Sequence, residues 1–227
     1  MTVQPYTNIS RVFDENYTLQ YDMPYDVEQT VTFSVHCLGN LILTSGAILA
    51  CDPFSVNEGC RPFTQTVPPG TYPVFVSIAH FSPRRDKRVA CAMLRICESE
   101  AVRWSNATID GRNPSAIDGM YGYGVDSGLG CFMDADAGEA IKRKLTGSFA
   151  KFEKYQTLVN NKLLNNAIFD GFGGTEWADL QLDRNIQANT IVFKAGWGDG
   201  GYPCFWGYDA SDRLISLVTD FILFSQS

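Results

Sequence analysis

Short segments in which apolar and polar residues alternate recur in two long stretches of this 227-residue chain. They include "VTFSVH" at 31–36, "TYPVFVSIAHF" at 71–81 and "NTIVFKAGW" at 189–197. A period of two places every second side chain on one face of a strand, so these segments predict half-buried strands. "VACAMLRIC" at 89–97 is apolar at nearly every position, which is typical of a central strand buried on both faces.

Turn residues separate the predicted strands. Thr44-Ser45-Gly46 lies between the apolar runs "LIL" and "AILA" and predicts a tight hairpin. "PRRDKR" at 83–88 predicts a charged turn, and "ASD" at 210–212 predicts a hairpin between the last two strands, "YPCFWGYD" and "RLISLVTDFIL". Residues 110–120 are rich in Gly, Pro and Asn and are expected to form a loop.

The middle of the chain changes to a helical pattern. "DADAGEAIKRKL" predicts a helix with Asp136 as its N-cap and Glu139 completing a capping box. A second helix is expected from a stripe that only one polar residue interrupts, and the glycine-rich "DGFGGT" is expected to end it; the stripe consists of Phe149, Phe152, Gln156, Val159 and Leu163. "TEWADLQL" is then expected to add one or two further helical turns.

The organisation of the chain follows from these patterns. Residues 1–30 are polar and aromatic without a clear period, so we expect an irregular N-terminal arm. Residues 31–227 contain no linker or repeat, and a chain that is 45% hydrophobic can bury one core. We therefore expect a single α+β domain, with a mostly antiparallel β body and a helical segment inserted at about 135–182.

Charge and cysteine content limit the function classes. The net charge of −7 argues against a general nucleic-acid binder or a protein that binds anionic membranes, but it is compatible with a basic protein partner. The seven cysteines are irregularly spaced and accompany only two histidines, so we expect buried free thiols rather than a zinc site. We see no signal peptide and no apolar run long enough to span a membrane, so we expect a cytoplasmic location.

Five sequence blocks occur in an order that resembles a known family. They are "GNLILTSGAILACDPF", "VPPGTYPVFVSIA", "RVACAMLRI", "YGVDSGLGCFMDADA" and "GWGDGGYPCFWGYD", the last followed by "LVTDF". Together they resemble the uncharacterised family called domain of unknown function 4241, over roughly residues 39–221. The resemblance implies little about activity, because the family is named for lacking a known function.

Carboxylates beside strand ends and glycine-rich turns are the main candidates for chemistry. Such positions suit hard metal ions and general acid–base groups. We expect a divalent cation, Mg²⁺ or Mn²⁺, to be held by Asp126, Asp134, Asp199 and Asp220. The proposed catalytic residues are Asp126, Asp199 and His80, which ends a strand. The alternative for each aspartate is structural, as a turn residue, a helix cap or a buried acid with a partner.

Basic and aromatic residues supply candidate ligand contacts. Arg84 and Arg88, in the charged turn, are expected to hold a phosphate group, and Trp197 and Tyr202 are expected to line a pocket for a ring or sugar. The alternatives are a solvated hairpin tip for the arginines and core packing for the aromatic residues.

Two functional hypotheses remain open. The first is a metal-dependent hydrolase of a phosphoester or nucleotide-like substrate, with the metal activating water. The second is a non-catalytic binding protein, such as an inhibitor, an immunity protein or a ligand-sequestering protein, that uses an acidic and aromatic-rich surface. The expected partner is a small phosphorylated ligand or a basic protein. The first hypothesis requires the carboxylates to converge on one point, whereas the second requires only an accessible binding surface.

Overall fold

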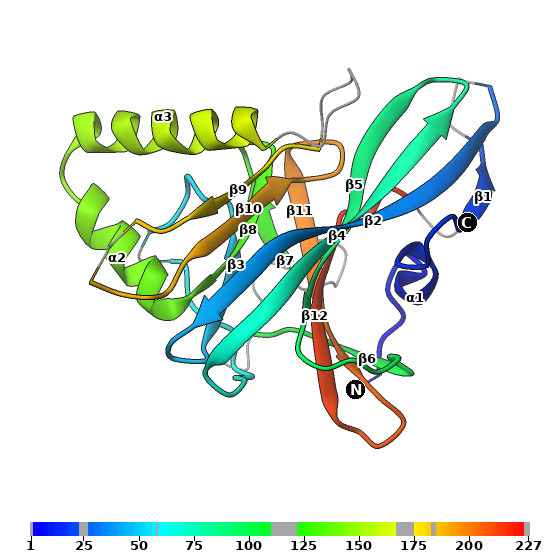
Figure 1. The fold of residues 1–227 in the computed structure, drawn as a ribbon, viewed down its shortest axis with the longest axis horizontal. Helices are drawn as coiled ribbons and strands as arrows, with labels where there is room; N and C mark the ends of the chain where they lie inside the picture. The colour runs from blue at the N-terminus through cyan, green and yellow to red at the C-terminus, as the bar shows by residue number, and fades with distance from the viewer. Residues whose placement is uncertain are drawn as a thin grey trace.

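Two β-sheets and a pair of helices form three layers (Figure 1). The computed structural model describes residues 2–22, 27–57, 59–109, 122–166, 175–182 and 185–224. The smaller sheet lies between the larger sheet and the helices, and a short N-terminal arm covers the far face of the larger sheet. The fold is therefore α+β and mostly antiparallel, as the sequence predicts.

The larger sheet contains eight strands within the described residues. Seven follow the order β1-β2-β4-β5-β12-β11-β6, and β7 pairs with β11. Central β5 is buried along most of its length, as its apolar sequence predicts. The strands are β1 (Thr18–Tyr21), β2 (Gln29–Leu43), β4 (Gly70–Ser82), β5 (Asp86–Arg95), β6 (Arg103–Asn106), β7 (Gly122–Val125), β11 (Gly200–Tyr208) and β12 (Leu214–Asp220).

The smaller sheet has the order β3-β8-β10-β9. One face packs against the larger sheet through side chains such as Phe132 and Phe193, whose ring centroids lie 5.1 Å apart. The other face carries the helices. The strands are β3 (Ile48–Cys51), β8 (Leu129–Asp134), β10 (Thr190–Lys194) and β9 (Trp177–Leu180).

The hairpin predicted at Thr44-Ser45-Gly46 is wrong. Strand β2 ends at Leu43 and pairs with β4, whereas β3 pairs with β8 in the other sheet. The turn therefore carries the chain from one sheet to the other. Gly46 adopts a φ of +78°, and a Cβ there would lie only 2.0 Å from the Val67 carbonyl oxygen. The local sequence predicts a sharp turn correctly, but the partner of the next strand is chosen by long-range packing.

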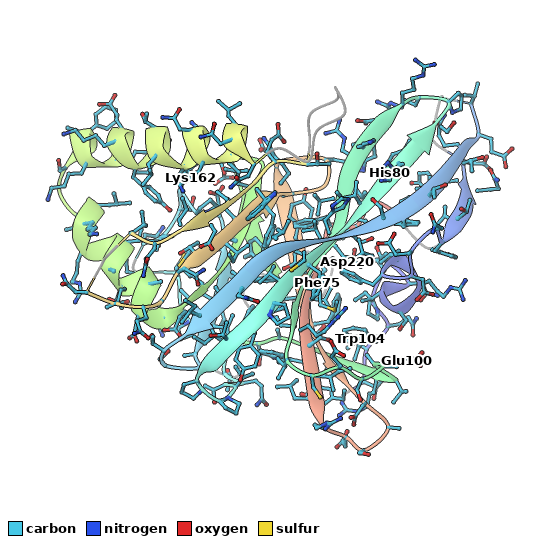
Figure 2. All side chains as sticks on the ribbon, viewed as in Figure 1. Phe75, His80, Glu100, Trp104, Lys162 and Asp220 are labelled. Atoms are coloured by element: carbon cyan, nitrogen blue, oxygen red, sulfur yellow. The ribbon has the colours of Figure 1, made fainter. Side chains whose placement is uncertain are left out.

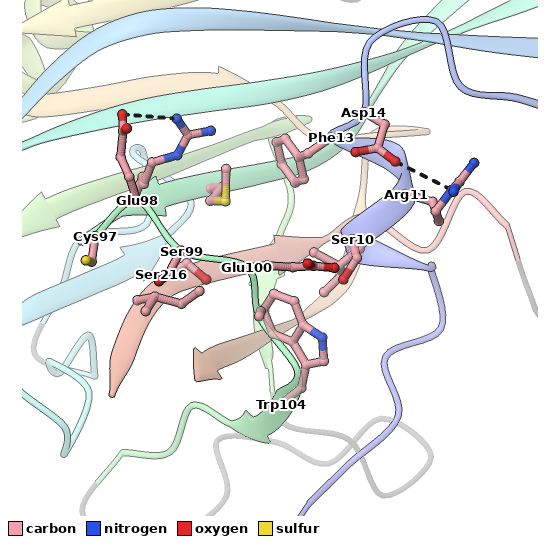
Figure 3. Close-up of a pocket in the computed structure, with 15 residues that line it drawn as sticks. Ser10, Arg11, Phe13, Asp14, Cys97, Glu98, Ser99, Glu100, Trp104 and Ser216 are labelled. Carbon is pink, nitrogen blue, oxygen red and sulfur yellow. Dashed lines mark ion pairs between the residues drawn. The ribbon is translucent and has the colours of Figure 1, made fainter. Parts of the chain in front are cut away.

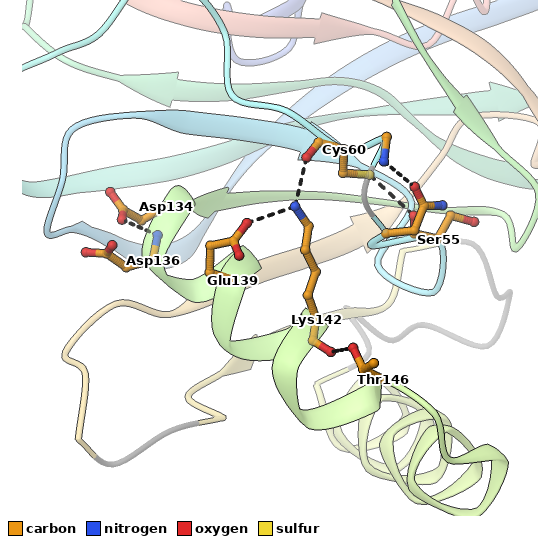
Figure 4. Close-up of polar contacts among 9 residues, drawn as sticks. Ser55, Cys60, Asp134, Asp136, Glu139, Lys142 and Thr146 are labelled. Atoms are coloured by element: carbon orange, nitrogen blue, oxygen red, sulfur yellow. Dashed lines mark hydrogen bonds and ion pairs between the residues drawn. The ribbon is translucent and has the colours of Figure 1, made fainter.

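Two helices form the outer layer, α2 (Ala135–Leu145) and α3 (Phe149–Asn165). The N-cap of α2 is Asp134, not Asp136, because the Asp134 carboxylate accepts a hydrogen bond from the Asp136 N–H at 2.9 Å. Figure 4 shows this cap, and also Lys142, which fixes α2 to the loop between β3 and β4 by donating to the Cys60 carbonyl at 3.1 Å.

The predicted apolar stripe of α3 is correct only in part. Val159 and Leu163 are buried, but Tyr155 joins them instead of Phe149, which is 76% exposed. The "TEWADLQL" segment forms strand β9 rather than further helix, because residues 177–180 pair with β10. The predicted loop at 110–120 and the "DGFGGT" helix end fall almost entirely outside the described residues.

The N-terminal arm is more regular than expected. It contains helix α1 (Ile9–Val12), and its strand β1 pairs with β2 at the edge of the larger sheet. Ile9 and Val12 are buried against the larger sheet. The Val3 N–H donates to the Trp104 carbonyl at 3.0 Å, so the arm also contacts β6 at the opposite edge. The arm thus extends the core on this face.

Candidate functional site

Asp134 is fully buried and surrounded by hydrogen-bond donors from the turn between the sheets. Its carboxylate accepts bonds from the Ser45 and Gly46 N–H groups at 3.1 and 3.2 Å and from the Thr44 and Ser45 hydroxyls. The Asp136 N–H adds a further bond from α2. A carboxylate surrounded in this way has its lone pairs occupied by the protein. Asp134 therefore joins β2, β3 and α2.

Asp220 anchors the N-terminal arm. It is 0% exposed, and its carboxylate accepts bonds from the Thr7 N–H at 2.8 Å and the Thr7 hydroxyl at 2.6 Å. The Ile222 N–H donates a third bond at 2.9 Å. Burial raises the pKa of Asp220, while the hydrogen bonds from Thr7 and Ile222 oppose that rise. The partner that an acid in an apolar strand requires is thus the arm of the same chain.

Asp126 and Asp199 lie close together on the surface. Val125 pairs with Gly200 at the end of the β7–β11 ladder, so the next residues, Asp126 and Asp199, follow opposite each other, and both are exposed. The loops also meet at Gly128, where a Cβ would lie 3.7 Å from the Gly198 Cα. A different aspartate, the buried Asp52, holds the first loop by accepting the N–H groups of residues 126 and 127.

The four predicted metal ligands therefore do not converge. Asp126 and Asp199 form a surface pair, whereas Asp134 and Asp220 are each enclosed by separate parts of the chain. Among the described residues, no group of three or more acidic, histidine or cysteine side chains is arranged to hold a metal ion. Magnesium and manganese sites need several oxygen ligands around one point.

This arrangement predicts that the fold does not depend on a divalent cation. We expect millimolar Mg²⁺ or Mn²⁺ to leave the melting temperature of the EDTA-treated protein unchanged, because no shared carboxylate site gains from binding. Differential scanning fluorimetry of the wild type and Asp199→Asn measures this. A cation-dependent rise that Asp199→Asn abolishes would contradict the expectation and restore the metal site.

His80, the predicted catalytic base, is half-buried on β4. One of its ring nitrogens, Nε2, lies 2.7 Å from the Ser34 hydroxyl on neighbouring β2. A serine and histidine at hydrogen-bond distance can act as nucleophile and base when a third group orients the imidazole and donors stabilise an oxyanion. His80 lies on β4, whereas Asp126 and Asp199 lie at the end of the β7–β11 ladder.

Arg84, Arg88 and Trp197 come together from distant parts of the sequence. The guanidinium carbons of Arg84 and Arg88 lie 5.9 and 5.0 Å from the centroid of the Trp197 ring, which is 41% exposed. The ring also contacts Phe81, and Arg88 Nε donates to Asp86 at 3.0 Å. Protein side chains thus occupy much of the indole surface that a ligand ring would need.

Tyr202 belongs to the core rather than to a binding surface. It is 6% exposed, packs edge-on against Phe221 and donates its hydroxyl to the Gly198 carbonyl at 2.8 Å. Burial and the nearby Asp199 carboxylate raise the pKa of Tyr202. Gly196, in the loop before β11, packs against the same part of the core, since a Cβ there would lie 2.8 Å from the Phe221 Cβ. A Cβ at Gly198 would meet no atom within 4 Å, so only Gly196 of these two brings its backbone close to another part of the protein.

The described residues also form a pocket of about 430 Å³ that the sequence did not reveal. We call it the arm pocket, because α1 and the residues just after it form one wall. The opposite wall consists of β5, β6, β12 and the 97–101 loop (Figure 3). Apolar side chains form part of the lining, including the rings of Phe13 and Trp104. Its volume lies within the range typical of ligand pockets.

The arm pocket carries more negative than positive charge. Its two arginines are paired, Arg11 with Asp14 at 3.5 Å and Arg95 with Glu98 at 4.0 Å. Glu100 makes no ion pair with any described residue. Figures 2 and 3 both show Glu100 beside Trp104. The pocket therefore presents an unpaired carboxylate next to an indole ring.

The Trp104 ring packs over Gly207, where no side chain obstructs it. The two residues are opposite each other in the β6–β11 pair, and a Cβ at Gly207 would lie 2.8 Å from Trp104 Cζ3. The sequence pattern of residues 100–107 indicates only a short strand, so it assigns no binding role to Glu100 or Trp104. The usable signal was two acidic residues, "ESE", just before an aromatic strand, but the arm that completes the pocket is about ninety residues away in sequence.

Fold and pocket together define a two-sheet α+β protein with a surface pocket and buried aspartates that join its segments. Residues 41–219 match the family described as "Protein of unknown function (DUF4241)". The chain therefore belongs to this family, as its five sequence blocks predict. No curated protein and no solved structure matches the chain.

The cysteines are free thiols. Cys51 and Cys131 are opposite each other on β3 and β8, with their sulfur atoms 3.7 Å apart. Burial raises the pKa of Cys91, and it raises that of Cys204 to about 12, so these thiols are poor nucleophiles. No helix in the described ranges has both the length and the apolar character needed to cross a membrane.

Proposed function

We propose that this protein is a non-catalytic binding protein whose arm pocket receives a basic side chain of a partner protein. The observation that carries the proposal is the unpaired Glu100 carboxylate beside the Trp104 ring, in a pocket whose two arginines are already paired. An arginine or lysine placed there would gain a cation–π contact and a charge-assisted hydrogen bond.

The net charge of the protein also supports a basic partner. A net charge of −7 attracts a basic partner at long range and speeds its association. The rings of Phe13 and Trp104 provide the apolar contact that interface anchors usually need. The serine hydroxyls of Ser10 and Ser216 in the pocket add acceptors for a guanidinium group.

The other hypotheses have less support. The metal-dependent hydrolase requires converging carboxylates, and Asp134 and Asp220 are committed to other contacts. A small phosphorylated ligand at Arg84 and Arg88 would compete with the contacts of those residues to Asp86 and Trp197.

The test is binding of a fluorescein-labelled tri-arginine peptide, followed by fluorescence anisotropy. We expect Glu100→Gln to weaken binding about three- to fivefold and Trp104→Leu about five- to tenfold, because one removes the unpaired charge and the other the ring face. Glu153→Gln, the same change on exposed α3, should leave the affinity unchanged. Equal binding by wild type and both pocket variants would overturn the proposal.

A further inference from the structure

The outer helical layer carries a second groove, which we call the helix groove. Helices α2 and α3 lie on the opposite side of the molecule from α1, which lines the arm pocket (Figure 1). The helix groove has a volume of about 350 Å³ and lies between α2, α3 and Leu182. Its floor is apolar and consists of Ile141, Leu145, Tyr155, Leu158 and Leu182. Leu158 is 42% exposed, so an apolar side chain remains in contact with water here.

Lysines surround this apolar floor. Lys144, Lys151 and Lys154 line the helix groove, and Lys151 and Lys154 form no ion pair with any described residue. Lys144 donates to the Leu182 carbonyl. Helix α3 also has no acidic residue in its first turn, so its positive N-terminal dipole is uncompensated near Lys151. This cationic groove stands out on a protein whose net charge is −7.

The groove continues past Leu158 and Leu182 into a more polar one of about 390 Å³. That second part is lined by Lys162, Asp179 and Gln181 among others, and Figure 2 shows Lys162 at this end of the helical layer. Lys151 and Lys162 are eleven residues apart on α3, a rise of about 16 Å at 1.5 Å per residue. An extended peptide of about five residues spans that length.

From these features we infer that the helix groove binds an extended acidic segment of a partner protein that carries a large apolar side chain. The apolar side chain would cover Leu158 and Tyr155, and acidic residues on either side would lie near Lys151, Lys154 and Lys162. Apolar area and charge complementarity act together at such sites. A fatty acid has a single carboxylate and would leave the Lys162 end without a contact. This inference concerns a site separate from the arm pocket.

The probe is a fluorescein-labelled hexapeptide, Glu-Glu-Leu-Phe-Glu-Glu. We expect the double variant Lys151→Glu, Lys154→Glu to weaken its binding at least about tenfold, and Leu158→Ser about fivefold, because these changes remove the charge and the apolar contact respectively. Arg143→Glu is the control, because Arg143 is exposed on α2 and does not line the helix groove. The affinity of this variant for the hexapeptide should stay within about twofold of the wild-type affinity.

Two further peptides and one competitor complete the test. Replacing the four glutamates of the probe with lysines, or its Leu-Phe with Ala-Ala, should abolish binding. Glu100→Gln should bind the acidic probe as the wild type does, which separates this site from the arm pocket. Unchanged binding by the double lysine variant, or displacement of the probe by equimolar dodecanoate, would overturn the inference. Thermal melts of all variants establish that they are folded.

Discussion

Replacing Asp134 with alanine is expected to lower the free energy of unfolding by about 3 to 5 kcal/mol, because several hydrogen bonds to a charged group are lost and each contributes about 1.5 to 3 kcal/mol. The carboxylate is fully buried and accepts bonds from Ser45, Gly46 and Asp136 N–H groups. Without it the buried Gly46 N–H loses its acceptor, which costs about 1 to 3 kcal/mol, whereas the N–H groups of Ser45 and Asp136 belong to exposed residues and cost less. The loss of the α2 N-cap adds to this cost.

Urea denaturation followed by circular dichroism measures the effect, and Asp136→Ala is the matched control. Asp136 is exposed and accepts one bond, from the Thr44 hydroxyl at 2.6 Å. Its loss is expected to cost less than about 1 kcal/mol. The comparison decides which aspartate caps α2. A larger loss for Asp136→Ala than for Asp134→Ala would show that the cap predicted from the sequence is correct and the structural assignment is not.

Most of the strands and the two long helices could be predicted because they depend on local patterns, although the same patterns predict helix at β9 and an irregular arm. Alternating residues predict β2, β4 and β10, and the apolar segment 89–97 predicts a central β5. Local patterns do not predict which strand a given strand pairs with. Residues 48–51 follow a sharp turn, so a hairpin is the local expectation, but their Cα partners are residues 131–134. Nothing in the turn itself encodes a partner eighty residues away.

The candidate site shows the same limit at the level of single side chains. Asp134 and Asp220 could be recognised as unusual, because acids next to buried strands need partners. The identity of those partners could not be recognised, since Thr7 is 213 residues from Asp220. A metal ion and a set of N–H and O–H donors satisfy a carboxylate equally well, and the sequence does not distinguish them. The three-dimensional structure is needed to see that the hydrogen-bond donors to both aspartates come from the protein itself.

Asp220→Ala is expected to release the N-terminal arm and, with it, one wall of the arm pocket. Thr7 donates two bonds to this carboxylate, and α1 follows only two residues later. We expect a loss of about 2 to 4 kcal/mol in unfolding free energy, since charged hydrogen bonds are each worth about 1.5 to 3 kcal/mol. Binding of the tri-arginine peptide should fall at least about tenfold, although Glu100 and Trp104 are unchanged. Limited proteolysis should cut the released arm.

The control for this variant is Thr7→Val, which removes the hydroxyl donor but keeps the N–H bond. It should cost about 1.5 kcal/mol, less than Asp220→Ala, and leave the pocket largely intact. If Asp220→Ala bound the peptide as tightly as the wild type, the arm would not be part of the binding site, and the proposed function would have to rest on Glu100 and Trp104 alone.

The titration of Asp220 provides an independent check on the same anchor. Because burial raises the pKa of Asp220 above the ordinary value of 3.8, the native state binds its proton more tightly than the unfolded state does. The stability contributed by that proton is fully present below the unfolded pKa and is lost as the pH rises through the folded pKa. The unfolding free energy of the wild type relative to that of Asp220→Asn should therefore be highest at acidic pH and fall as the pH increases. A relative value that stays constant across this window would contradict the raised pKa and mean that the hydrogen bonds from Thr7 and Ile222 fully offset the effect of burial.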